Sequence, residues 1–191
     1  MSTAFISLLV ILGLIVGLLF AVITIYNGLI KLRTRSEAAW SDISVQLKRR
    51  HNLIPNLVKT VKAYAGHEKD TLESVIKARN HAVEAPDKPG AMGMAEAGFA
   101  AALGRLFALA EDYPDLKADS SFLKLQDELS ELEEVIQMAR RFHNGCVRDY
   151  NEKLQTIPEN IIAAMFNFEK HAYFELPEGD PAHQVQEVDF S

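Results

Sequence analysis

The sequence predicts an all-α protein, with a single N-terminal transmembrane helix followed by an antiparallel, up-and-down four-helix bundle of long helices. Three observations lead to this prediction. The first 30 residues contain no Lys, Arg, Asp, Glu or His. Beyond them, apolar residues recur at helical spacing, without the alternating patterns and hairpin turns of strands. Turn-forming Pro, Gly and Asp residues separate the helical stretches.

The composition limits the class of protein. The chain has 191 residues, of which 48% are apolar and 24% charged, with a net charge of −6. An apolar share of this size excludes a disordered chain. The one cysteine, Cys146, excludes a disulfide framework and a cysteine-based zinc site. These totals fit one ordinary domain with a small additional segment.

Residues 5–26 form the predicted transmembrane helix. They are almost all apolar, and as a helix they measure about 33 Å, against about 30 Å for the hydrocarbon core of a bilayer. No basic residue precedes the run and no small-x-small cleavage site follows it, so we expect residues 1–26 to be a retained anchor rather than a cleaved signal peptide. Gly13 and Gly17 form a GxxxG pattern, which allows two such helices to pack closely.

Basic residues follow the span directly. Lys31, Arg33 and Arg35 come first, and residues 31–62 hold eight basic residues against two acidic ones. Lys and Arg beside a span are retained in the cytoplasm, and they attract anionic lipid headgroups. We therefore expect a single-pass protein of a bacterial inner or plasma membrane. Its N-terminus lies outside, its bundle lies in the cytoplasm, and the lipid bilayer is its first partner.

Four helical stretches with short joints are predicted, an arrangement typical of an antiparallel bundle. Their apolar residues follow 3/4 spacing. The first stripe is Ile30, Trp40, Ile43 and Leu47; the second is Ile54, Val58, Val61, Ala65, Leu72, Val75 and Ala82; a short third helix runs near residues 91–111; and the last follows the cap residues Asp119 and Ser120 to Ile157, with a gap near Leu154.

Pro55 leaves two possibilities open for the first helix. It suits the first turn of a new helix capped by Asn52, and it equally suits a kink in a helix that continues from the membrane to Tyr64 and Gly66. No obvious breaker lies between Tyr26 and Trp40, so the span is expected to continue into the bundle.

We place the bundle at residues 27–168 and an irregular acidic tail at residues 169–191. The tail has six acidic residues, with Lys170 as its one basic residue, and Pro and Gly are interspersed. Such a segment lacks regular structure but still docks through apolar residues, and Phe174, Val188 and Phe190 are its candidates for docking.

Several blocks of residues resemble the LemA family. They are residues 40–50 running into 53–58, Ala139 to Asn144, Val147 to Asn151, Tyr26-Asn27, Lys62-Ala63-Tyr64, His67-Glu68 and the closing Val188-Asp189-Phe190. The resemblance covers most of the chain. It implies an N-terminal membrane anchor followed by a helical up-and-down bundle, in a family without an established enzymatic activity. His143 departs from the aromatic Tyr expected at its position.

The sequence does not contain the patterns that enzymatic chemistry needs. It has six His residues but no HExxH or HxH, and no paired ExxH motifs for a metal within a bundle. Phosphate-binding glycine loops are also missing. The basic stretch lacks interleaved aromatic residues apart from Trp40, which favours lipid headgroups over nucleic acid. We therefore expect a non-enzymatic protein without cofactor, metal or nucleic acid.

Two polar stripes are the candidate site. Asp42, Gln46 and Arg49 share one helix face, and Arg140, Asn144, Arg148 and Asn151 share another. One interpretation is a buried hydrogen-bond network that fixes helix register, with Asp42 or Asp149 accepting from Arg. The other is an exposed face through which one bundle contacts its neighbour.

We therefore expect a membrane-associated scaffold that assembles with copies of itself. The alternative is a membrane-tethered adaptor, which presents a partner or substrate to a membrane protease or envelope enzyme. The adaptor requires a membrane-protein partner, whose identity the sequence does not give.

Overall fold

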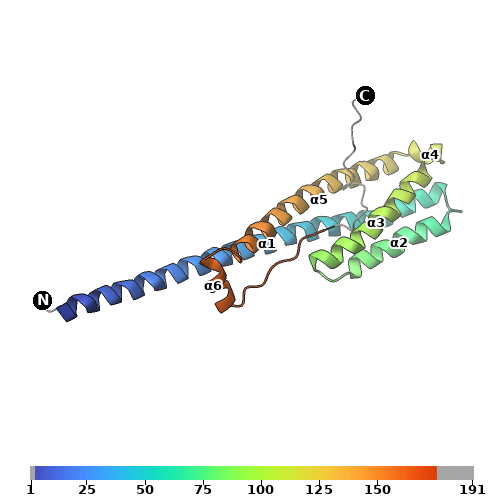
Figure 1. The fold of residues 1–191 in the computed structure, drawn as a ribbon. Helices are drawn as coiled ribbons and strands as arrows, with labels where there is room; N and C mark the ends of the chain where they lie inside the picture. Colours follow the sequence, from blue (N-terminus) through green and yellow to red (C-terminus); the bar gives the residue numbers. More distant parts are fainter. Residues whose placement is uncertain (1–2, 176–191) are drawn as a thin grey trace, which may run out of the picture. The chain divides into compact units, whose positions relative to one another are not determined.

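The computed structural model describes residues 3–175, and it is helical without any strand over that range. Six helices follow one another along the chain (Figure 1). They are α1 (Thr3–Tyr64), α2 (Lys69–Glu84), α3 (Pro89–Ala110), α4 (Pro114–Lys117), α5 (Ser120–Lys153) and α6 (Glu159–Met165). The all-α class and the apolar N-terminal helix are confirmed. The antiparallel four-helix arrangement stays a prediction.

Helix α1 continues through Pro55 without a break. A proline inside a helix removes one backbone hydrogen bond, so packing must hold the helix together at this point. Ile54 and Leu57, on either side of Pro55, are fully buried and provide that packing. The new helix capped by Asn52 is therefore the wrong alternative. α1 ends at Tyr64, and the turn before Lys69 divides the apolar stripe of residues 54–82 between α1 and α2.

Helix α5 begins as its cap residue predicts. The Asp119 carboxylate accepts hydrogen bonds from the backbone N–H groups of Ser121 (2.8 Å) and Phe122 (2.9 Å). These bonds satisfy two donors that the first turn of a helix leaves unpaired. α5 ends at Lys153, so the gap in the apolar stripe near Leu154 marks the end of the helix. The short helix α6 follows, which the sequence pattern did not predict.

The chain forms two compact units, which we describe separately. The anchor unit contains residues 3–39 and 144–171, and the core unit contains residues 40–143 and 172–175. This division by contacts differs from the division into anchor, bundle and tail, which stays a prediction.

The core unit is organised around apolar side chains from α1, α2, α3 and α5. Its largest buried cluster includes Leu57, Val75, Phe99 and Leu106, which are fully buried. Helix α3 is long and apolar enough to cross a membrane by composition alone. It packs along α2 instead and contributes Phe99 to the core, so we assign it to the core unit as a packed helix.

In the anchor unit, the N-terminal part of α1 exposes its apolar side chains. From Phe5 onward its most apolar window has a mean hydropathy of 3.1, and none of that window is buried. Further along, Leu29 packs against Ile162 and Ala163 of α6. A bare apolar stretch of this length is typical of a membrane-spanning helix.

Candidate functional site

A cluster of ionisable side chains is buried in the core unit between α1, α3 and α5. The Arg50 guanidinium donates to the carboxylates of both Glu96 and Glu133. The His51 Nε2 and the Glu96 Oε1 lie 2.7 Å apart. Arg50 and Glu96 are almost completely inaccessible, with side chains 6% and 3% exposed, whereas Glu133 is 45% exposed. Glu96 is therefore the inner partner of Arg50, and Glu133 is the outer one.

The buried cluster explains how a carboxylate is accommodated within α3. Burial raises the pKa of Glu96, but the hydrogen bond with His51 and the charges of Arg50 and His51 outweigh it, so the pKa lies below its usual value. Phe99 packs beside the cluster, with the Arg50 Cζ 5.2 Å from its ring centre. Arg50 and Glu96 compensate each other's buried charge and so join α1 to α3, although the buried Nε of Arg50 has no hydrogen-bond partner.

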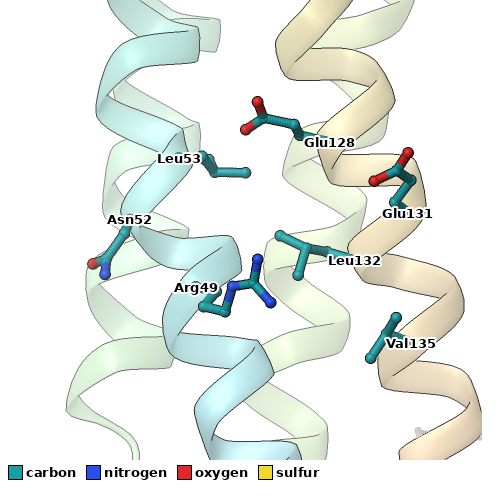
Figure 2. A pocket seen from close by; sticks show the side chains of 7 residues that line it. All are labelled: Arg49, Asn52, Leu53, Glu128, Glu131, Leu132 and Val135. Atoms are coloured by element: carbon teal, nitrogen blue, oxygen red, sulfur yellow. The ribbon is translucent and has the colours of Figure 1, made fainter.

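An open groove lies between α1 and α5 on the surface of the core unit (Figure 2). It has a volume of about 580 Å³ and is lined by Arg49, Asn52, Leu53, Glu128, Glu131, Leu132 and Val135. Figure 2 shows Arg49 extending from α1 toward α5, and Leu132 extending toward α1. The groove thus combines an apolar floor with one cation and two carboxylates. Such a surface suits a protein partner with mixed charges.

The predicted polar residues of the core unit lie on its surface. Asp42 and Arg49 are exposed and Gln46 is half-buried. Arg49 donates to the Gln46 side chain at 3.3 Å, one turn earlier in the same helix. The half-buried Arg140 lines a smaller pocket together with Glu133 and Phe174. These positions suit an interaction face better than a buried network, and the face stays a prediction.

The predicted residues of the anchor unit divide between surface and interior. Arg148 is 71% exposed and lies 3.9 Å from the carboxylate of its neighbour Asp149, so the buried ion pair expected there is not what the structure shows. Asn144 is half-buried, with a polar contact of its own. Asn151 is buried, and its amide pairs with the backbone of His171 through two hydrogen bonds of 2.9 Å. Asn151 thus holds the segment that follows α6.

His171 fixes that segment to the anchor unit. Its Nδ1 lies 2.7 Å from the Ser36 hydroxyl, and its ring packs against Tyr150 at 4.7 Å between ring centres. Burial lowers the pKa of His171, the charge of Glu37 opposes that shift and the charge of Arg33 adds to it. The neutral imidazole is therefore the form that fits this position.

Phe174 docks onto the core unit, as the sequence predicts. It is buried against Ile43, Leu47 and Ile136, and its ring lies 5.5 Å from that of Trp40. The next residue, Glu175, passes so close to α3 that a Cβ atom at Gly93 would overlap its carbonyl. The other two candidates for docking, Val188 and Phe190, lie outside the described residues.

The residues predicted to contact lipid headgroups or to pack in the span are all accessible. Lys31, Arg33 and Arg35 are exposed, and Arg33 forms an ion pair of 2.9 Å with Glu37. Gly13 and Gly17 lie on the exposed apolar helix, with open space where a Cβ atom would stand. Their positions leave room for a second helix, but close packing between two spans stays a prediction.

Arg50, His51 and Glu96 are buried polar residues that the sequence patterns did not predict. For two of them the sequence holds a signal of burial. Arg50 continues the apolar stripe of Ile43, Leu47 and Ile54, and Glu96 is the one acidic residue of α3. Within residues 3–175, no group of three His, Cys or acidic side chains is arranged to hold a metal ion. Cys146 is buried and unpaired with another cysteine.

The fold and the bare apolar segment define a membrane-associated helical protein. The family model described as LemA family matches residues 39–190, so the chain belongs to the LemA family. Two magnetosome proteins are similar over 181 residues: MamQ 2 of Paramagnetospirillum magneticum at 29% identity and MamQ of Magnetospirillum gryphiswaldense at 28%. Each alignment covers 81% of this chain and 66% of the relative. Protein LemA of Metamycoplasma hominis is 26% identical over 153 residues, covering 80% and 69% of the two chains. The chain thus spans about two thirds of the length of these relatives.

Proposed function

We propose that this chain is a non-enzymatic, single-pass membrane protein whose helical core unit acts as a scaffold by assembling with copies of itself. We place it in a bacterial inner or plasma membrane, with the N-terminus outside and the core unit in the cytoplasm. The exposed Lys31, Arg33 and Arg35 after the apolar segment support this orientation. The names of the relatives state no enzymatic activity, which supports a non-enzymatic role.

The observation that carries the scaffold proposal is the separation of charge around the α1–α5 groove. Arg49 lines the groove from α1, and Glu128 and Glu131 line it from α5. A helix face with a basic side and an acidic side complements a second copy of itself, because each side meets its opposite. The apolar Leu53 and Leu132 between them supply a dry centre for the contact.

The test is the mass of the full-length protein in mild detergent, measured by light scattering with the detergent contribution subtracted. We expect a defined oligomer. Arg49→Glu is expected to shift it toward the monomer, because it places a third carboxylate beside Glu128 and Glu131. Lys59→Glu makes the same change of charge on an exposed part of α1 outside the groove, and it is expected to leave the mass unchanged.

A second pair of variants separates the contribution of the span. Gly13→Leu combined with Gly17→Leu blocks close approach of two apolar helices, whereas Ile15→Phe adds bulk on the opposite side of the same exposed helix. A smaller oligomer in the glycine variant alone would assign part of the assembly to the span. A wild-type protein that is monomeric in detergent would overturn the scaffold and make the adaptor the leading function.

A further inference from the structure

The anchor unit carries an apolar surface on α6 that faces away from its own packing. The inner side of α6, Ile162 and Ala163, is buried against α1. On the outer side, Ile161 and Met165 are 57% and 66% exposed, and Ile157 just before the helix is 80% exposed. Ile161 and Met165 are four positions apart within the helix, so they lie on one side of α6, and Ile157 lies in the turn before it. Phe166, which follows the helix, is also exposed.

The position of α6 along α1 relates this surface to the lipid. A hydrocarbon core of about 30 Å takes about 20 residues of helix, so a span that begins at Phe5 leaves that core near Thr24. The contacts of α6 with α1 fall on Val22, Ile25, Tyr26 and Leu29. The first charged residue of α1 is Lys31. Helix α6 therefore lies at the level where the span passes from hydrocarbon into the headgroup region.

Aromatic side chains gather at the same level. The Tyr26 ring lies 4.8 Å from that of Phe166 and 5.6 Å from that of Phe168, measured between ring centres. Tyr concentrates at membrane interfaces, where its hydroxyl reaches the headgroups, and the two Phe rings extend the apolar surface around Tyr26. The acidic residue of α6, Glu159, is paired with Lys153 at 2.5 Å, so it does not bring an uncompensated negative charge to the lipid.

We propose that α6 is an interfacial helix, which rests in the headgroup boundary of the bilayer with Ile157, Ile161 and Met165 inserted among the upper acyl chains. The occupant of this apolar surface is lipid, because α6 packs on Val22 and Ile25, directly after the exposed apolar part of α1. The helix then lies beside the end of the span and fixes the depth of the anchor unit in the bilayer. This inference rests on the membrane anchoring of α1, and it does not depend on self-assembly.

The experiment uses the full chain in vesicles of phosphatidylcholine and phosphatidylglycerol. In a Cys146→Ala background, a single cysteine is placed at Ile161, at Leu14 or at Ala38 and labelled with an environment-sensitive fluorophore. Leu14 is exposed in the middle of the apolar segment, and Ala38 is exposed about 20 Å beyond Thr24 along α1. Each label is challenged with lipid carrying a shallow or a deep spin label, and with iodide in the water.

The label at Ile161 is expected to be quenched most by the shallow spin label and to be protected from iodide. The label at Leu14 is expected to respond to the deep spin label, and the label at Ala38 to iodide. Met165→Cys repeats the measurement one turn along the same side of α6. Circular dichroism checks that every variant keeps the helicity of the parent protein.

Two results would overturn the inference while leaving the anchor in place. In the first, the protein floats with the vesicles but the Ile161 label is as accessible to iodide as the Ala38 label. In the second, the Ile161 label is protected from both iodide and lipid quenchers, which is the result expected if a second protein chain covers α6. A protein that does not float with the vesicles would overturn the anchoring itself.

Discussion

Replacing Glu96 with Gln removes the inner partner of the buried Arg50. Breaking a buried ion pair from one side costs about 3–5 kcal/mol, because the remaining charge stays buried without compensation. Arg50 keeps Glu133 as a second partner. We therefore expect a loss near the lower end of that range, about 3 kcal/mol in the free energy of unfolding of the core unit.

The matched control is Glu133→Gln, which removes the outer partner. Glu133 is 45% exposed, so solvent screens its interaction with Arg50. An exposed ion pair contributes about 0.2–1 kcal/mol. The same Glu→Gln change in a partner of Arg50 is therefore expected to lower the free energy of unfolding by at least about 2 kcal/mol less at position 133 than at position 96.

Urea denaturation of the full-length protein in detergent measures both losses. Trp40 is the one tryptophan of the chain and lies in the core unit, so its emission reports the unfolding of that unit. With a urea dependence of about 2 kcal/mol per M, Glu96→Gln is expected to lower the midpoint by about 1.5 M and Glu133→Gln by less than about 0.5 M. Equal small shifts for the two variants would refute the assignment of Glu96 as the structural partner.

The pH dependence supplies a second check on the same residue. Because the folded-state pKa of Glu96 is lowered, its stabilisation is fully present above the unfolded pKa of about 4.3 and is lost as the pH falls through the folded pKa. The difference in stability between the wild type and Glu96→Gln is therefore expected to be constant near neutral pH and to narrow in acid. A difference that stays unchanged into strong acid would contradict the charged state of Glu96.

Two further predictions concern the segment after α6. Phe174→Ala is expected to release that segment from the core unit at a cost of about 3 kcal/mol and to shift the Trp40 emission to the red. Tyr173→Ala, at an exposed neighbouring position, is expected to leave the emission unchanged. Because burial lowers the folded pKa of His171, its stabilising contribution is present above the unfolded pKa of about 6.5 and is lost as the pH falls through the folded pKa. The ring resonance of His171, assigned through a His171→Gln variant, is expected to titrate below pH 6.5 by NMR; a midpoint above that value would count against the buried, neutral ring.

Local signals in the sequence were sufficient for the helical class and for several helix ends. Asp119 begins α5 by accepting two backbone N–H groups, and this capping depends on residues within one turn. The apolar run beginning at Phe5 has no charged residue to interrupt it, so its helix required no knowledge of distant contacts. Phe174 was identified as a candidate for docking because it is a large apolar residue in an acidic segment.

Features that depend on contacts between distant residues could not be predicted from the sequence. Helix α6 has only seven residues and no side-chain cap, so its stability comes from packing on α1 about 130 residues earlier. The pairing of Arg50 with Glu96 joins two helices in a way that spacing along one helix does not indicate. Arg49 and Arg50 are adjacent in sequence, yet one is exposed and the other buried, because only the latter falls on the core side of α1.

Glu175 passes close to Gly93, so a substitution at position 93 changes the stability of α3 and the docking of the Glu175 segment in opposite directions. Alanine favours an α-helix over glycine by about 1 kcal/mol, so Gly93→Ala strengthens α3 as an isolated helix. The added methyl group also overlaps the Glu175 carbonyl and displaces the chain that follows Phe174. One added methyl group is therefore expected to favour the helical state of α3 and to weaken the docking of the segment. The intrinsic stability of α3 therefore favours alanine at this position, whereas the docked segment requires glycine.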